Sequence, residues 1–171
     1  MAQLAEVGRE QAEEYRAGSR QPVGRHGVVM GVYAVFVVAA ALGVKAAGRE
    51  LPEQLSVKDL LTLAVGTHKV SRTITKDSVT GPLRAPFTRH GGQGGPAEVM
   101  DEPRHDSAVR HSIGELLTCP FCLDVWGVTL FTLGLVVAPR LTRLVAGGFS
   151  ALAGADFLQL AYARAQQTAE G

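Results

Sequence analysis

The sharpest chemical feature of the sequence is a pair of cysteines, Cys119 and Cys122, separated by one proline and one phenylalanine. At the start of a helix, the positive end of the helix dipole lowers the pKa of a thiol and populates the reactive thiolate. Redox catalysis is therefore one hypothesis. Thiol oxidoreductases, however, carry such a pair after a strand in a soluble α/β fold, and no strand-rich sequence flanks these cysteines.

A metal site is the second hypothesis for the same thiols. Two cysteines at this spacing supply half of a tetrahedral zinc site. His111, His105 or His90, or the cysteine pair of a second subunit, could supply the rest. The third hypothesis is structural, because two small apolar thiols and a proline can shape the entry to a helix. The structural interpretation is favoured, and zinc bound by Cys119, Cys122 and His111 is the alternative.

Asp156 is a different signal, because it lies well inside a predicted membrane helix. A carboxylate in a membrane span is costly and normally faces the interior of a helix bundle. It could relay protons or bind an ion in a small transporter, or it could form a structural hydrogen bond to a neighbouring helix. His68 and Lys69 are its expected partners if their helix crosses the membrane.

Size, charge and motifs exclude several function classes. The 171 residues suffice for one domain or one small bundle, and the formal net charge of +1 without a long basic run argues against nucleic-acid binding. The sequence contains no phosphate-binding loop, zincin-type histidine pair or nucleophile elbow. We therefore expect a protein that is not an enzyme.

Membrane helices must position these residues, because the apolar residues are gathered into long blocks. Residues 27–44 carry no charge, and about 20 apolar residues cross a bilayer core of about 30 Å. This predicts a transmembrane helix over 27–47. It follows a polar N-terminal tail over 1–26, in which Ala5 to Ala17 could form a charged surface helix.

The next predicted helix, over 56–74, is short. Ser56 is its expected N-cap, and Asp59 stands where a capping box places its acid. The helix either crosses the membrane, with Lys69 and Arg72 reaching the surface, or lies in the interface. A polar loop with prolines and a glycine-rich stretch is predicted over 75–112.

Two further transmembrane helices are predicted. Residues 113–139 form an interfacial turn and a helix that has Cys119 as N-cap and ends before Pro139. A Gly- and Ala-rich helix over 140–163 follows, before a tail over 164–171, and its small residues would permit a homo-oligomer. The expected fold is an all-α bundle of three or four helices in the lipid bilayer.

The distribution of basic residues predicts the orientation. With four crossings, nine lysines and arginines of the tail and the 75–112 loop lie on one side, and five lie on the other. Because short cytoplasmic segments are enriched in basic residues, both termini and the thiol pair are expected on the cytoplasmic side of the plasma membrane.

Three stretches resemble one bacterial family of membrane proteins. They are Thr67-His-Lys-Val-Ser-Arg-Thr-Ile-Thr-Lys-Asp-Ser-Val-Thr-Gly-Pro-Leu-Arg-Ala-Pro-Phe-Thr88, Gly114-Glu-Leu-Leu-Thr-Cys-Pro-Phe-Cys-Leu-Asp-Val-Trp126 and Asp156-Phe-Leu-Gln-Leu-Ala-Tyr162. The family is the one catalogued as domain of unknown function 1360, and the resemblance covers residues 58–163.

The resemblance implies a small multi-span protein of the bacterial plasma membrane without an assigned activity. Some relatives are described as sporulation proteins. Besides the thiol pair, the matching positions offered as site candidates are Arg72, Asp77, Arg84, Trp126 and Asp156. We expect a structural or interaction role, with a metal- or redox-responsive protein and a small transporter as the alternatives.

Overall fold

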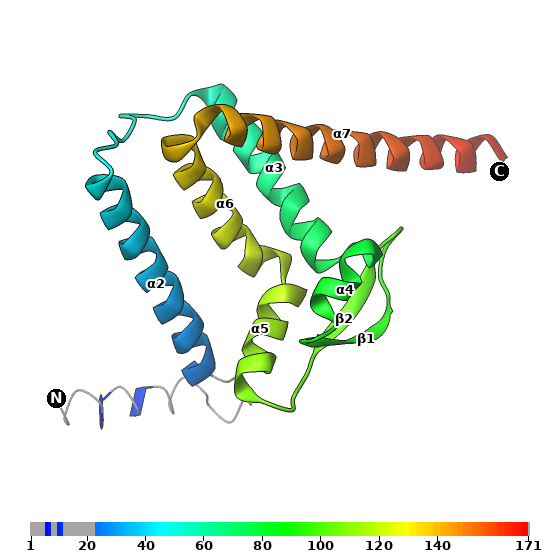
Figure 1. The fold of residues 1–171 in the computed structure, drawn as a ribbon. Helices are drawn as coiled ribbons and strands as arrows, with labels where there is room; N and C mark the ends of the chain where they lie inside the picture. Colours follow the sequence, from blue (N-terminus) through cyan, green and yellow to red (C-terminus); the bar gives the residue numbers. More distant parts are fainter. Residues whose placement is uncertain (1–5, 8–9, 12–22, 171) are drawn as a thin grey trace.

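The computed structural model describes residues 6–7, 10–11 and 23–170. Most of the predicted tail, including most of its expected surface helix, lies outside the described residues. From residue 23 onwards the elements follow in this order (Figure 1): α2 (Val23–Ala46), α3 (Val57–Thr75), the 3₁₀ turn η1 (Ser78–Thr80), α4 (Gly81–Arg84), β1 (Thr88–Gln93), β2 (Val99–Pro103), α5 (Ala108–Thr118), α6 (Pro120–Val137) and α7 (Pro139–Glu170).

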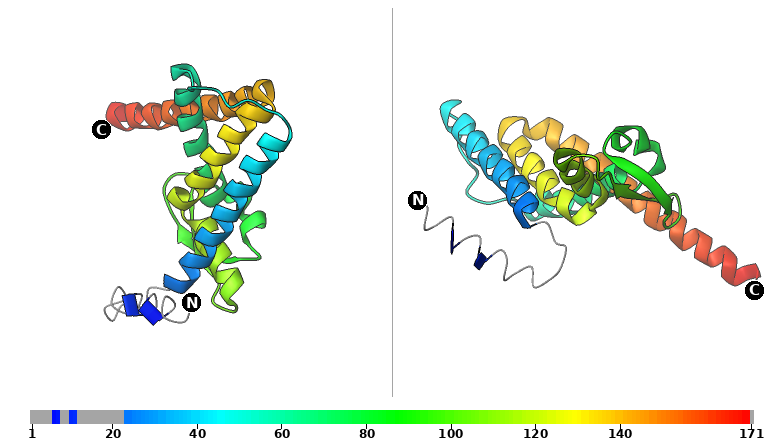
Figure 2. Two further views of the ribbon diagram at one scale, coloured as in Figure 1. Left: turned by 90° about the vertical axis from the view of Figure 1, so that its left-hand side faces the viewer. Right: turned by 90° about the horizontal axis from the view of Figure 1, so that it is seen from below.

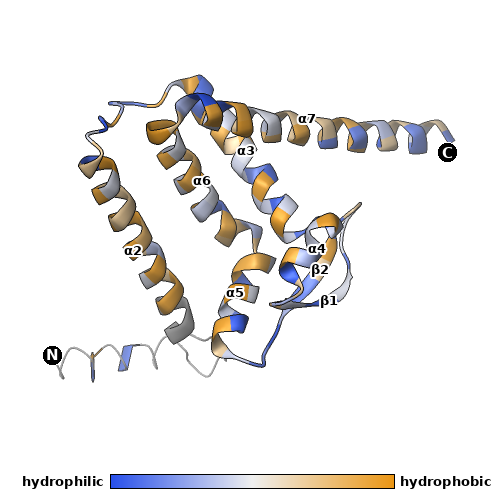
Figure 3. Cartoon of the chain, in the orientation of Figure 1, coloured by the Kyte–Doolittle hydropathy of each residue, from blue (hydrophilic) through white to orange (hydrophobic). Residues whose placement is uncertain are grey.

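Helix α6, and helix α2 from Gly27 onwards, consist mostly of apolar residues (Figure 3). The 24 residues of α2 span about 36 Å at about 1.5 Å per residue. Large apolar side chains stay exposed on both helices, for example Met30 and Val35 on α2 and Leu130 on α6. A water-soluble surface rarely carries such contiguous apolar area. With α7, these helices are the three that are long and apolar enough to cross a membrane within the described part of the chain.

Helix α3 follows α2 and precedes α6 in the main bundle, and it runs in the opposite direction to both. Figures 1 and 2 show α2 and α6 rising from the same end of the molecule, while α3 descends beside α6. The predicted N-cap at its start is confirmed, because the Asp59 backbone N–H donates to Ser56 Oγ over 3.0 Å. The Asp59 carboxylate accepts from Ser56 Oγ over 2.9 Å, whereas in a capping box it would accept from the Ser56 backbone N–H. Leu63 of α3 forms the buried core with Leu135 and Ala146.

Helices α3 and α7 approach each other closely because Gly66 has no side chain. A Cβ atom at Gly66 would lie 2.8 Å from the carbonyl oxygen of Ala146. Nearby, Ser150 Oγ donates a hydrogen bond of 2.7 Å to the carbonyl oxygen of Thr62. Small residues therefore serve here to pack one helix on another.

Helix α7 starts directly after α6 and changes direction. Pro139 ends the apolar run of α6, as predicted, and stands at the first position of α7. Instead of running back beside α6, α7 packs mainly on α3 and extends away from α2 (Figure 1). It continues to Glu170, so residues 164–170 of the predicted tail are helical.

Residues 75–112 differ from the predicted polar loop, and the all-α prediction needs one correction. The segment holds η1, α4, the antiparallel hairpin of β1 and β2, and the start of α5. A bulge between His90 and Gly92 interrupts the pairing. The backbone N–H of Val99 bonds to the Lys76 carbonyl over 2.8 Å, which fastens the hairpin to the end of α3. We call residues 76–118 the polar module.

Candidate functional site

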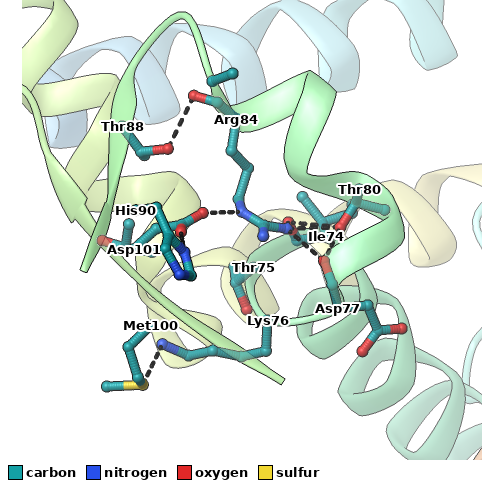
Figure 4. A network of polar contacts seen from close by, with 12 residues as sticks. Ile74, Thr75, Lys76, Asp77, Thr80, Arg84, Thr88, His90, Met100 and Asp101 are labelled. Carbon is teal, nitrogen blue, oxygen red and sulfur yellow. Dashed lines mark hydrogen bonds and ion pairs between the residues drawn. The ribbon is translucent and has the colours of Figure 1, made fainter. Parts of the chain in front are cut away.

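A buried arginine organises the polar module (Figure 4). The Arg84 side chain is fully buried, and its Nε donates to Asp101 Oδ2 over 2.8 Å. Its Nη1 donates to the carbonyl oxygens of Ile74, at 2.8 Å, and Asp77, at 3.0 Å. A buried charge is tolerated when it is paired and hydrogen-bonded. Arg84 thereby joins the end of α3 to strand β2.

Lys69 lies between two carboxylates from different elements. Its Nζ is 2.8 Å from Asp156 Oδ2 of α7 and 3.4 Å from Asp77 Oδ2, which follows α3. The Lys69 side chain is 10% exposed, whereas that of Asp156 is 43% exposed. The prediction that Lys69 pairs with Asp156 is therefore confirmed, and the pair ties α3 to α7.

The remaining predicted charged positions belong to the same network. Arg72 forms an ion pair with Glu98, which lies just before β2, and Glu98 also pairs with Asp77 through the backbone in an isolated β-bridge. The structure thus brings Arg72, Asp77, Arg84 and Asp156 together around the end of α3. The sequence analysis did not identify Glu98 and Asp101, the partners of Arg72 and Arg84, because both lie in a segment predicted as a loop.

A second ion pair fixes the opposite end of α3. Arg143 of α7 donates from Nε to Asp59 Oδ1 over 2.8 Å and from Nη2 to Asp59 Oδ2 over 3.0 Å. Two parallel bonds between a guanidinium and a carboxylate restrict geometry as well as adding energy. The sequence analysis named Asp59 only as part of the helix start and predicted no partner for it.

Helix α5 carries its own local pairs. Ser107 caps its start by accepting a hydrogen bond from the Arg110 N–H at 3.2 Å, and the Arg110 guanidinium lies 2.8 Å from Asp106. That guanidinium holds the pKa of the Asp106 carboxyl below its ordinary value. His111 contacts the Arg104 carbonyl through Nδ1 at 3.1 Å, and its Nε2 is 3.3 Å from Glu115.

The two thiols occupy the junction between α5 and α6. Cys119 is the N-cap of α6, as predicted, and its Sγ accepts a hydrogen bond of 3.2 Å from the Cys122 N–H. Both cysteines are free. Over the residues that the structure describes, no three His, Cys, Asp or Glu side chains are grouped as metal ligands. The thiols and His111 are therefore not brought together as the predicted zinc site.

Trp126 joins α2 to α6. Its ring centroid is 5.2 Å from that of Tyr33, in an edge-to-face arrangement, and 5.8 Å from that of Phe36. The Tyr33 hydroxyl is also 2.8 Å from Thr129 Oγ1. Such aromatic pairs add stabilisation beyond area burial, so Trp126 acts as a packing residue.

Comparison with known families decides the classification. The model of a family described as "Protein of unknown function (DUF1360)" matches residues 61–162, which is more than half of the chain. The chain belongs to this family. The DUF1360 region starts in α3 and ends in α7, so it includes the ion-pair network around α3 and the thiol pair, whereas α2 precedes it. The chain matches no curated protein and no solved structure.

Proposed function

We propose that this DUF1360 protein is an integral protein of a bacterial plasma membrane with a structural or interaction role, and that α2, α3, α6 and α7 cross the bilayer. One observation carries the proposal. Because α2 and α6 run in the same direction (Figure 1), a chain that crosses through both must return between them. Helix α3 is the element that makes this return.

The contacts of α3 support a crossing despite its charged residues. Charged side chains within a membrane usually pair inside the protein, and Asp59 and Lys69 pair with Arg143 and Asp156 of α7. The 19 residues of α3 span about 28 Å, which is close to the thickness of the hydrocarbon core. Its exposed side chains include apolar ones such as Leu61.

Charge supports a cytoplasmic position for the polar module. The N-terminal tail joins α2 at the end where the module lies, and residues 1–26 and 72–119 together hold ten lysines and arginines. The connections on the opposite side hold five: Lys45, Arg49, Lys58, Arg140 and Arg143. The positive-inside rule then places the module and the N-terminus in the cytoplasm. Helix α7 begins at the opposite side, where Arg143 pairs with Asp59. Its Asp156 meets Lys69, whose Nζ is also 3.4 Å from Asp77 at the edge of the module, so α7 runs back toward the cytoplasmic side. Such a fourth crossing places both termini in the cytoplasm, as expected from the sequence.

The charged residues are already held in ion pairs, and this favours a scaffolding role over transport or metal binding. Arg72, Arg84 and Lys69 are committed to carboxylates that fix helices and the hairpin. Asp156 is held by Lys69, and the thiol pair caps a helix. A rigid module held at the membrane surface is suited to contact a partner, and no specific observation favours the transporter or the redox alternative.

Labelling of single cysteines in spheroplasts tests the topology. In a background with Cys119→Ser and Cys122→Ser, a cysteine replaces Glu53, Ser78 or Gln167, all of which are exposed. A membrane-impermeant maleimide should label position 53 from outside and positions 78 and 167 only after permeabilisation. Identical labelling at 53 and 78 would show that α3 does not cross and would refute the proposal. Position 167 behaving like 53 would instead show that α7 does not cross.

A further inference from the structure

Helices α2 and α6 leave an apolar cavity beside their contact. The two helices meet through Tyr33 and Trp126, which lie in the first halves of their helices, and through Thr129 near the middle of α6. Beyond this contact lies a cavity of about 670 Å³, within the range of about 300–1,000 Å³ that is usual for small-molecule sites. We call it the α2–α6 groove, and its apolar lining includes Val37, Ala40, Val44, Val128, Leu133 and Val136.

The polar groups inside the groove are already satisfied. The Tyr33 hydroxyl and Thr129 Oγ1 bond to each other, and Thr132 Oγ1 donates to the carbonyl oxygen of Val128 over 2.8 Å. The interior therefore demands no polar ligand, and its chemistry suits a hydrocarbon chain.

Two cations stand at one end of the groove. Lys45 in the last turn of α2 and Arg49 just beyond it both line the cavity and are exposed. Neither has an ion-pair partner among residues 23–170. Because the end of α2 lies at the membrane surface if α2 spans the bilayer, both side chains stand at the level of the lipid headgroups, where basic residues attract anionic lipids.

We propose that the α2–α6 groove binds one anionic phospholipid, with an acyl chain along the apolar lining and the headgroup phosphate between Lys45 and Arg49. A single lipid molecule supplies both the hydrocarbon and the negative charge that the groove lacks, and in the bilayer it already surrounds the site. The inference rests on the proposed membrane crossing, because a chain outside the bilayer would meet no lipid.

Native mass spectrometry of the detergent-purified full chain tests the proposal, with phosphatidylglycerol and phosphatidylcholine as probes. The wild type should bind one phosphatidylglycerol more tightly than phosphatidylcholine. Replacing Lys45 and Arg49 by Gln should weaken this binding about 30-fold, since two cations contribute about 1 kcal/mol each and 1.4 kcal/mol is tenfold. Ala40→Phe, which fills the groove and keeps both cations, should also reduce one-to-one binding.

A matched control uses cations at the same end of the molecule that do not line the groove. Lys58→Gln with Arg140→Gln removes two exposed charges from the starts of α3 and α7 and should leave lipid binding unchanged. Equal affinity for both lipids, or binding that persists without Lys45 and Arg49, would overturn the inference. So would a disulfide between copies through a cysteine at Leu133, because a second chain would then fill the groove.

Carbonate extraction separates the two possible failures. A chain that stays in the membrane pellet yet shows no charge-dependent lipid binding refutes the groove and leaves the proposed function standing. A chain released into the supernatant refutes the membrane role and, with it, the lipid site.

Discussion

Arg84 shows why one residue type suits the centre of the polar module. A guanidinium presents donors in a rigid fork, and here the fork reaches a carboxylate of β2 and two backbone carbonyls at the end of α3. The compact ammonium group of a lysine cannot occupy these separate positions at once. The module therefore depends on the geometry of this side chain as much as on its charge.

Arg84→Met should destabilise the module strongly, because Asp101 is left buried without its cation. Removing one member of a buried ion pair costs about 3–5 kcal/mol, measured as a loss of thermal stability in detergent. The hairpin should also become sensitive to limited proteolysis near Gly94. Arg110→Met, which removes only an exposed pair with Asp106, is the control. Equal stability of the two variants would contradict the role assigned to Arg84.

Lys69 and Asp156 should behave as a coupled pair. Lys69→Met and Asp156→Asn each break the contact of 2.8 Å, and the double variant should lose less stability than the sum of the single ones. Coupling of about 0.5–3 kcal/mol is usual for residues in contact. Strictly additive losses of stability in a double-mutant cycle would mean that the contact between Lys69 and Asp156 does not stabilise the protein. Proton flux through vesicles that disappears in Asp156→Asn at unchanged stability would revive the transporter alternative.

At the scale of elements, the contact between α3 and α7 depends on the absence of a side chain at Gly66. Gly66→Leu should force the helices apart, because a Cβ atom there already meets the backbone of Ala146. Overpacking costs about 1–3 kcal/mol, which a thermal shift in detergent would detect. Gly31→Leu on α2 is the matched control, since a Cβ atom there has nothing within 4 Å. If both variants melt together, the close packing of α3 on α7 is not essential.

The start of α6 offers a test of the thiol pair. Cys119→Ser should keep the helix start intact, since serine is a preferred N-cap, whereas Cys119→Val should cost about 1 kcal/mol. Neither change should alter the metal content of the purified protein, measured by atomic absorption. Stoichiometric zinc that is present in the wild type and absent after replacement of both cysteines would instead establish the metal site.

Local chemistry made the ends of several helices predictable. Ser56, Cys119 with Pro120, and Pro139 all act where the sequence places them, since capping and the missing N–H of proline depend on neighbouring residues. The hairpin was not predictable, because β1 is rich in glycine and depends on distant backbone partners. The direction of α7 was not predictable for a related reason. Hydropathy indicates whether a helix can cross a membrane, whereas the packing of α7 on α3 sets its direction.

At the scale of the whole molecule, α7 acts as a brace for the return helix. It supplies a partner to each half of α3, through Arg143 and through Asp156. Without these partners, the charged side chains of α3 would face lipid at about 2.5–3.5 kcal/mol each at the bilayer centre. In the proposed topology, the crossing by α3 is therefore a property of the assembled bundle.

Ending the chain after Ala138 should consequently change the topology. Helix α3 should fail to cross, and a cysteine at Ser78 should become accessible to an impermeant maleimide from outside. Ending the chain after Ala163 keeps both Arg143 and Asp156 and should leave that cysteine protected. Protection in both truncated chains would show that α3 crosses the bilayer unaided.

The ion pair between Asp59 and Arg143 can form only late in synthesis of the chain. The two residues are 84 positions apart, and ribosomes add about 5–20 residues per second. For about 4–17 s after Asp59 is made, its partner does not yet exist. If α3 crosses as proposed, it lacks this partner while the intervening residues are made, and the order in which helices enter the bilayer need not follow the order in which they are translated.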